Sequence, residues 1–180
     1  MTTIAREDDT DAWLDQPEAG WTPVTPTQAV SAGTFVSGDP GGNRLRVRYF
    51  RRDHDGALLA KVWFGPGTQG PPGHAHGGSM ASILDEAMGA AAWSAGHAVV
   101  AAELTTRFRR MLPLGSCCIV EASVASTDGR KVRTVAELRT RGLDLVAEGE
   151  ALFIELDPAR FGELVEQASA MLCLPPKGDR

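Results

Sequence analysis

The sequence is poor in cysteine, in aromatic residues and in long apolar runs. Three cysteines in 180 residues are too few for a disulfide framework, so we expect free thiols in a reducing, cytoplasmic setting. No apolar run approaches the roughly 20 residues that cross a bilayer, and the polar first residues do not resemble a signal peptide. The net charge of −5 excludes a global basic field for nucleic acid. We expect a soluble protein that binds neither membranes nor nucleic acids.

The composition is that of one globular domain, with 43% hydrophobic and 23% charged residues. Prolines and glycines interrupt residues 1–43, where we expect an irregular flap or lid containing short helices near residues 11–14 and 27–31. The rest divides into a central domain, a C-terminal helix capped by Asp157 and Pro158, and a tail. These three parts span residues 44–157, 158–174 and 175–180.

The central domain alternates between strand and helix patterns. Apolar residues at every second position, as at Leu45, Val47 and Tyr49, predict a strand, and His54-Asp55-Gly56 predicts a hairpin turn after it. Two strands thus precede a long apolar helix, and three or four long strands follow it. The strands are expected over residues 44–50, 57–64, 99–109, 117–126, 132–141 and 143–156. This order predicts an α+β fold in which one curved antiparallel sheet wraps around the helix.

The expected helix, residues 78–95, is closed by Gly96 and carries only two charged residues, Asp85 and Glu86. A helix this apolar is buried on most sides. Burying a carboxylate costs several kcal/mol unless it is paired or hydrogen-bonded. A carboxylate on such a helix, close to a helix N-terminus that can hold an anion, indicates a reaction site.

The loop before this helix carries a specific motif. Residues 70–78 read Gly-Pro-Pro-Gly-His-Ala-His-Gly-Gly, and Asp85 follows His76 by nine residues. This pattern resembles the acyl-CoA thioesterase branch of the hotdog superfamily, in particular the carboxyl-terminal-modulator-type and phenylacetyl-CoA thioesterases. Three further segments fit the same family, and the resemblance covers about residues 44–158. These segments are residues 109–115, 129–131 and 151–154.

The resemblance implies a hotdog fold and a homodimer, or a dimer of dimers, with active sites at the dimer interface. The glycine loop then comes from one chain and the helix carboxylate from the other. It implies that Asp85 is the catalytic carboxylate, as base or nucleophile, and that the Gly77 amide binds the oxyanion. It also implies that His76 is a third catalytic residue, which helps to set the loop and touches the thioester. The substrate is an acyl-CoA, and no cofactor is implied beyond the coenzyme A of substrate and product.

Supporting roles remain open at several positions. Glu86 is a second candidate carboxylate, and Gly78 offers a second amide. The family holds a Thr or Ser about sixteen residues after its catalytic Asp, where this chain has Ala101. Three nearby side chains are candidates to replace that hydroxyl: Glu103, Thr105 and Thr106.

Guanidinium and ammonium groups suit the phosphates of coenzyme A. Arg109 and Arg110 form one candidate group and Arg130 and Lys131 a second, although ion pairs on a solvated face explain the same residues. His74 and His76 have the spacing of zinc ligands, but no further ligand follows at suitable spacing, so no metal site is expected.

Three alternatives to a thioesterase stay open. The chain could be an acyl-CoA-binding or regulatory hotdog protein without catalysis, a structural dimer, or a hotdog hydratase. The absent hydroxyl at Ala101 favours the first of these. Turnover of acyl-CoA, and its loss when Asp85 is replaced, distinguishes the enzyme from the binding protein.

Overall fold

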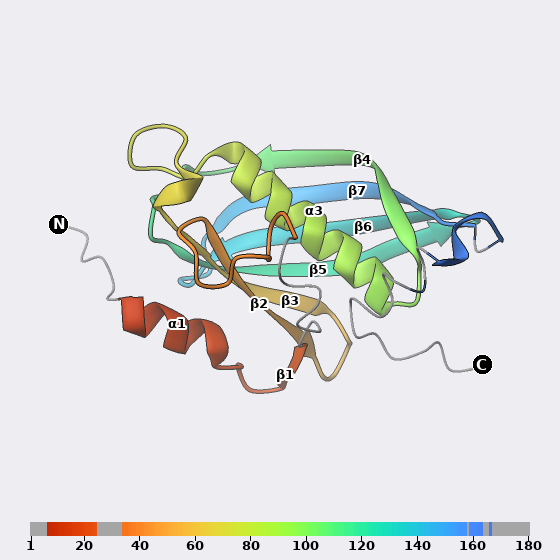
Figure 1. Ribbon diagram of the computed structural model, residues 1–180, viewed down its shortest axis with the longest axis horizontal. Coiled ribbons are helices and arrows are strands. Elements are labelled where there is room, and N and C mark those ends of the chain that lie inside the picture. Colours follow the sequence, from red (N-terminus) through yellow and green to blue (C-terminus); the bar gives the residue numbers. More distant parts are fainter. Residues whose placement is uncertain (1–6, 25–33, 158, 164–165, 167–180) are drawn as a thin grey trace.

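The computed structural model describes residues 7–24, 34–157, 159–163 and 166. It contains one seven-stranded antiparallel sheet in the order β1-β2-β3-β5-β6-β7-β4, with the long helix α3 across one face (Figure 1). The strands are β1 (Trp21–Val24), β2 (Leu45–Arg52), β3 (Leu58–Phe64), β4 (Val99–Phe108), β5 (Cys117–Asp128), β6 (Lys131–Thr140) and β7 (Leu145–Glu155). The expected α+β arrangement of a curved sheet around a central helix is confirmed.

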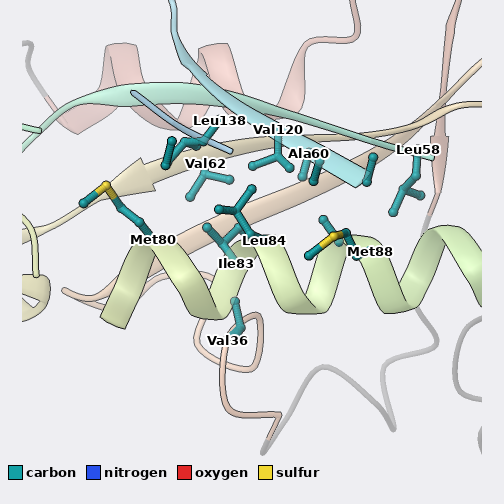
Figure 2. Close-up of a cluster of buried hydrophobic side chains, with 14 of the residues drawn as sticks. Val36, Leu58, Ala60, Val62, Met80, Ile83, Leu84, Met88, Val120 and Leu138 are labelled. Carbon is teal, nitrogen blue, oxygen red and sulfur yellow. The ribbon is translucent and has the colours of Figure 1, made fainter. Parts of the chain in front are cut away.

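Helix α3 (Gly77–Ser94) agrees with the predicted helix to within one residue at each end. Its apolar stripe, including Leu84 and Met88, packs against Val62 and Val120 of the sheet (Figure 2). The helix lies close to β7 because Gly149 has no side chain there. A Cβ atom at Gly149 would lie 3.4 Å from the Leu84 Cβ and 2.9 Å from the Met88 Cε.

The N-terminal region is more regular than expected, because it forms the helix α1 (Glu7–Asp15) and the strand β1. The predicted helix near residues 11–14 is the end of α1, whereas residues 27–31 lie outside the described residues. β1 pairs with β2 at the edge of the sheet, and its short length and Pro23 hide it in the sequence. A proline is tolerated there because an edge strand leaves one row of amides unpaired.

Helix α1 packs on the face of the sheet opposite α3. The buried Lys61 Nζ donates hydrogen bonds to the carbonyls of Trp13 (3.2 Å) and Gln16 (2.6 Å) and forms an ion pair with Glu18 at 2.7 Å. Lysine is favoured at this place because the last carbonyls of a helix carry partial negative charge. α1 is therefore fixed to the outer face and does not cover the helix α3.

A different part of the N-terminal region reaches α3. Val36, in the loop of residues 34–44, approaches the helix from the side away from the sheet (Figure 2). Of the expected flap, this loop is the described part that contacts the central helix.

The last strand leads into the start of the expected C-terminal helix. The Asp157 Oδ1 accepts a hydrogen bond from the Ala159 amide at 3.0 Å, as an N-cap does, and residues 159–163 are helical. The continuation of this helix and the tail at 175–180 lie outside the described residues, except for residue 166.

The two described cysteines are free thiols on opposite faces of β5. Cys118 lies in the main core and Cys117 contacts the cluster under α1. Burial raises the pKa of Cys118 to about 12, so this thiol is not reactive. Among the described helices, none has the length and apolar character needed to cross a membrane.

Candidate active site

The loop before α3 is fixed by its own hydrogen bonds. The His76 amide donates to the Thr68 carbonyl at 2.7 Å, and the Ala75 amide donates to the Leu112 carbonyl at 2.8 Å. The His74 ring nitrogen Nδ1 lies 2.9 Å from the Pro72 carbonyl, so this histidine holds the loop. The first turn of α3 is thereby held in a defined position.

His76 is the N-cap of α3. Its Nδ1 accepts a hydrogen bond from the Gly78 amide at 2.8 Å. A nitrogen that accepts carries no proton, so the neutral ring carries its proton on Nε2. The structure therefore gives His76 the loop-setting role that the resemblance implies.

The two glycines of the motif differ in the state of their amides. The Gly78 amide is used by His76, whereas the Gly77 amide makes no hydrogen bond to any described residue. A Cβ atom at Gly77 would lie 3.2 Å from the Phe108 ring, so the Gly77 backbone faces β4. At the positive end of a helix, this free amide is suited to bind an anion.

Asp85 is a half-buried carboxylate without a partner. Its Oδ1 is buried and makes no hydrogen bond among the described residues. Burial raises its pKa above the usual aspartate value. Such a group is available for chemistry, because no structural contact uses that oxygen.

Glu86 is placed differently, although it is the next residue. The Tyr49 hydroxyl of β2 donates a hydrogen bond to Glu86 Oε1, and Ser37 contributes hydrogen bonds as well. Burial is the main cause that raises the pKa of both Tyr49 and Glu86. Glu86 thus joins α3 to β2 and to the 34–44 loop, which is a structural role.

The two carboxylates lie on opposite flanks of α3. Successive residues of a helix are about 100° apart around its axis. Asp85 comes eight residues after Gly77 and four before Gly89, so it lies about 80° around the axis from Gly77 and about 40° from Gly89. Gly77 faces Phe108 of β4, and a Cβ atom at Gly89 would lie 3.5 Å from the Phe153 ring of β7. Asp85 therefore lies on the flank that faces β7 and the edge strand β4.

A cleft of about 360 Å³ opens at the first turns of α3. The loop of residues 34–44 forms one wall with Phe35 and Arg44, and residues 67–69, just before the motif, form another. His76, Gly78 and Ser79 line the end of the cleft at the helix N-terminus. The cleft is thus continuous with the motif and is large enough for part of a ligand.

The basic residues lie at two ends of the sheet. Arg109 and Arg110 follow the end of β4 near Gly77, where they pair with Glu148 and Asp144 at 2.5 and 3.1 Å. Arg130 and Lys131 lie at the β5–β6 turn, and the Arg130 guanidinium donates to the Glu155 carbonyl at 2.8 Å.

Arg109 and Arg110 are the candidates near the motif. They lie next to Phe108, which faces Gly77. Lys131 lies at the far end of β4, because it pairs with Ile154 of β7, which in turn pairs with Val100. Within the described part of the chain, no cluster of three or more His, Cys, Asp or Glu side chains could hold a metal ion.

Comparison with known proteins shows what this chain is similar to. Residues 72–147 match the family model of the thioesterase superfamily, and this segment contains the motif, α3 and most of the sheet. Over this segment the chain is similar to the thioesterase superfamily. It is 38% identical over 141 residues to acyl-coenzyme A thioesterase THEM4 of Xenopus laevis, an alignment that covers 69% of this chain and 64% of that protein.

A second acyl-coenzyme A thioesterase is similar to a comparable length of the chain. THEM4 of Bos taurus is 32% identical over 132 residues, which are 72% of this chain and 54% of the bovine protein. The chain thus spans between half and two thirds of the length of these two relatives.

Solved structures of the superfamily share the fold. The crystal structure of one thioesterase superfamily protein is 35% identical, with a TM-score of 0.58, and covers 61% of this chain and 53% of that one. A Bacillus halodurans protein crystallised with CoA is 25% identical, with a TM-score of 0.51, and covers 54% of this chain and 66% of that one. These neighbours confirm the predicted hotdog fold.

Proposed function

We propose that this protein is an acyl-CoA thioesterase that hydrolyses an acyl-CoA to a free acid and coenzyme A. The observation that carries the proposal is the pair of free groups on α3, the unpaired Asp85 carboxylate and the unpaired Gly77 amide. The similarity to acyl-coenzyme A thioesterases, and to a protein crystallised with CoA, supports the choice of substrate class.

The two groups meet the two needs of thioester hydrolysis. The thioester carbonyl oxygen gains negative charge when it is attacked, and the Gly77 amide at the helix N-terminus stabilises that charge. The Asp85 carboxylate takes a proton from the attacking water or attacks the carbonyl carbon itself. In either route the C–S bond breaks and the sulfur leaves with the electron pair. In the second route a water then hydrolyses the acyl-aspartyl anhydride, which releases the free acid and restores the Asp85 carboxylate.

Asp85 and Gly77 of one chain cannot act on the same carbonyl. They are eight residues apart on one helix, which separates their backbones by about 12 Å along its axis, whereas reacting groups must lie within about 3.5 Å. We therefore propose that a site combines Gly77 of one chain with Asp85 of a second chain in a homodimer.

Strand β4 is the proposed dimer interface. It pairs only with β7, so its other edge is free among the described strands. Val100, Leu104 and Phe108 along it expose 39–51% of their surfaces. A long exposed edge with apolar side chains is suited to pair with another strand.

A charge on this edge tests the dimer. Leu104→Lys is expected to halve the mass that light scattering measures for the wild type, from twice to once the 19.1 kDa of the chain. Val135→Lys is the matched control, because Val135 is 40% exposed on the central strand β6 and Leu104 is 39% exposed. An unchanged mass in Leu104→Lys would exclude pairing through β4.

The activity is tested by thiol release from a panel of acyl-CoAs, from acetyl-CoA and phenylacetyl-CoA to palmitoyl-CoA. We expect turnover of at least one member, and the preferred chain length defines the acyl group. Binding without turnover of any thioester would instead support the non-catalytic acyl-CoA-binding protein, which the alanine at position 101 favours.

A further inference from the structure

Two buried polar atoms without partners lie at the junction of α3 and β4. Three side-chain atoms of this kind occur in the described part of the chain, namely Asp85 Oδ1, Thr106 Oγ1 and Thr134 Oγ1. Leaving a buried polar group without a hydrogen bond costs about 1–3 kcal/mol. A functional contact is one explanation for such a group.

The register places Thr106 beside the part of α3 that carries Asp85. Thr106 pairs with Gly149 of β7, and paired residues share a face of the sheet. A Cβ atom at Gly149 would lie 3.4 Å from the Leu84 Cβ, so α3 crosses the sheet at this pair. Asp85 follows Leu84 directly, on the flank of the helix that faces β7 and β4.

The other polar residues of β4 lie on the opposite face. Thr105 pairs with the exposed Glu150, and Glu103 pairs with Leu152; both Thr105 and Glu103 are exposed. Ala101 has no polar side chain. Of the three candidates, Thr106 is therefore the one whose side chain lies on the same side of the sheet as Asp85.

We infer that Thr106 is a further catalytic residue, whose hydroxyl oxygen holds the attacking water beside Asp85. This inference rests on the proposed thioesterase activity. The water donates one hydrogen bond to the Asp85 carboxylate and one to the Thr106 oxygen, which leaves a lone pair directed at the thioester carbon. Its oxygen forms the new C–O bond and its proton passes to Asp85. The C–S bond then breaks, and this proton neutralises the leaving thiolate.

Substitution of Thr106 tests this role. Thr106→Val keeps the shape and removes the hydroxyl, and we expect it to lower kcat about 10–100-fold with little change in KM, within the range of proton-transfer catalysis. Thr106→Ser restores the hydroxyl and should recover most of the lost kcat. Both variants should keep the wild-type dimer mass and thermal midpoint within a few degrees.

Two matched controls separate catalysis from packing. Thr105→Val removes a hydroxyl from the opposite face of the same strand, and Thr134→Val removes a buried, unpartnered hydroxyl from β6; neither should lower kcat. The proposed role of Thr106 is wrong if Thr106→Val keeps the wild-type kcat, or if Thr106→Ser is as slow as Thr106→Val. It is also wrong if Ala101→Thr raises kcat tenfold above the wild-type value. Absence of turnover by the wild type on every thioester would instead contradict the proposed function, and this role with it.

Discussion

Asp85→Asn is expected to lower kcat for thioester hydrolysis by about 10²–10⁴-fold, the contribution of a general base. The amide has the shape of the carboxylate but can neither take a proton nor attack. Glu86→Gln is the matched control, because Glu86 is the neighbouring carboxylate and points to Tyr49 on the other flank. It should keep kcat within a few-fold, whereas equal losses in both variants would contradict the assignment of Asp85.

The pH dependence of the wild type gives a second measurement on Asp85. Burial raises the pKa of this carboxyl above the usual value of 3.8, and a base acts only when ionised. The rate should therefore fall as the pH drops through an ionisation above 3.8.

A raised pKa also means that Asp85 favours folding most when protonated, and that this contribution is lost as the pH rises. Asp85→Asn should thus raise the free energy of unfolding near neutral pH.

Gly77→Pro is expected to lower kcat by about 10²–10³-fold, the value of one oxyanion donor. Gly77 is the first residue of α3, where proline is tolerated. The substitution removes the N–H group and adds ring carbons, of which the Cβ lies near Phe108. The preceding His76 has φ −69° and ψ 140°, a conformation that a following proline favours.

Gly77→Ala is the control for this substitution, because it keeps the amide and adds a Cβ near Phe108. It should retain more activity than Gly77→Pro, although the Phe108 ring must shift by a few tenths of an ångström. Equal rates in the two variants would show that the Gly77 amide is not the oxyanion donor.

The two inactive variants together test the shared site. In a mixed dimer, the Asp85→Asn chain still supplies Gly77 and the Gly77→Pro chain still supplies Asp85, so one of the two sites is intact. An equal, randomly paired mixture should recover about a quarter of the wild-type activity, since half of the dimers are mixed. A mixture that stays inactive would show that each site is built from a single chain.

Local patterns in the sequence were sufficient for much of the fold. The alternation in β2 and the apolar run of α3 predict these elements because period and burial are read within one segment. The motif of residues 70–78 and its distance to Asp85 are likewise local, so they identified the candidate loop and carboxylate. β1 was missed because four residues with a proline carry no periodic signal.

The roles of adjacent residues were decided only by the tertiary structure. The motif spacing favoured Asp85 over Glu86 by resemblance alone. The physical difference between them depends on which flank of α3 meets Tyr49 of β2, 37 residues away. It could not separate Thr106 from Thr105, because the register of β4 against β7 decides which face each occupies.

The tertiary structure also decided which of the Gly77 and Gly78 amides is free, because this depends on the orientation of the His76 ring. The sequence by itself determined which segments form the helix, the strands and the candidate loop. The tertiary structure decided which of their polar groups are used in structural contacts and which stay free for chemistry, because a hydrogen bond depends on positions in space and not on spacing along the chain.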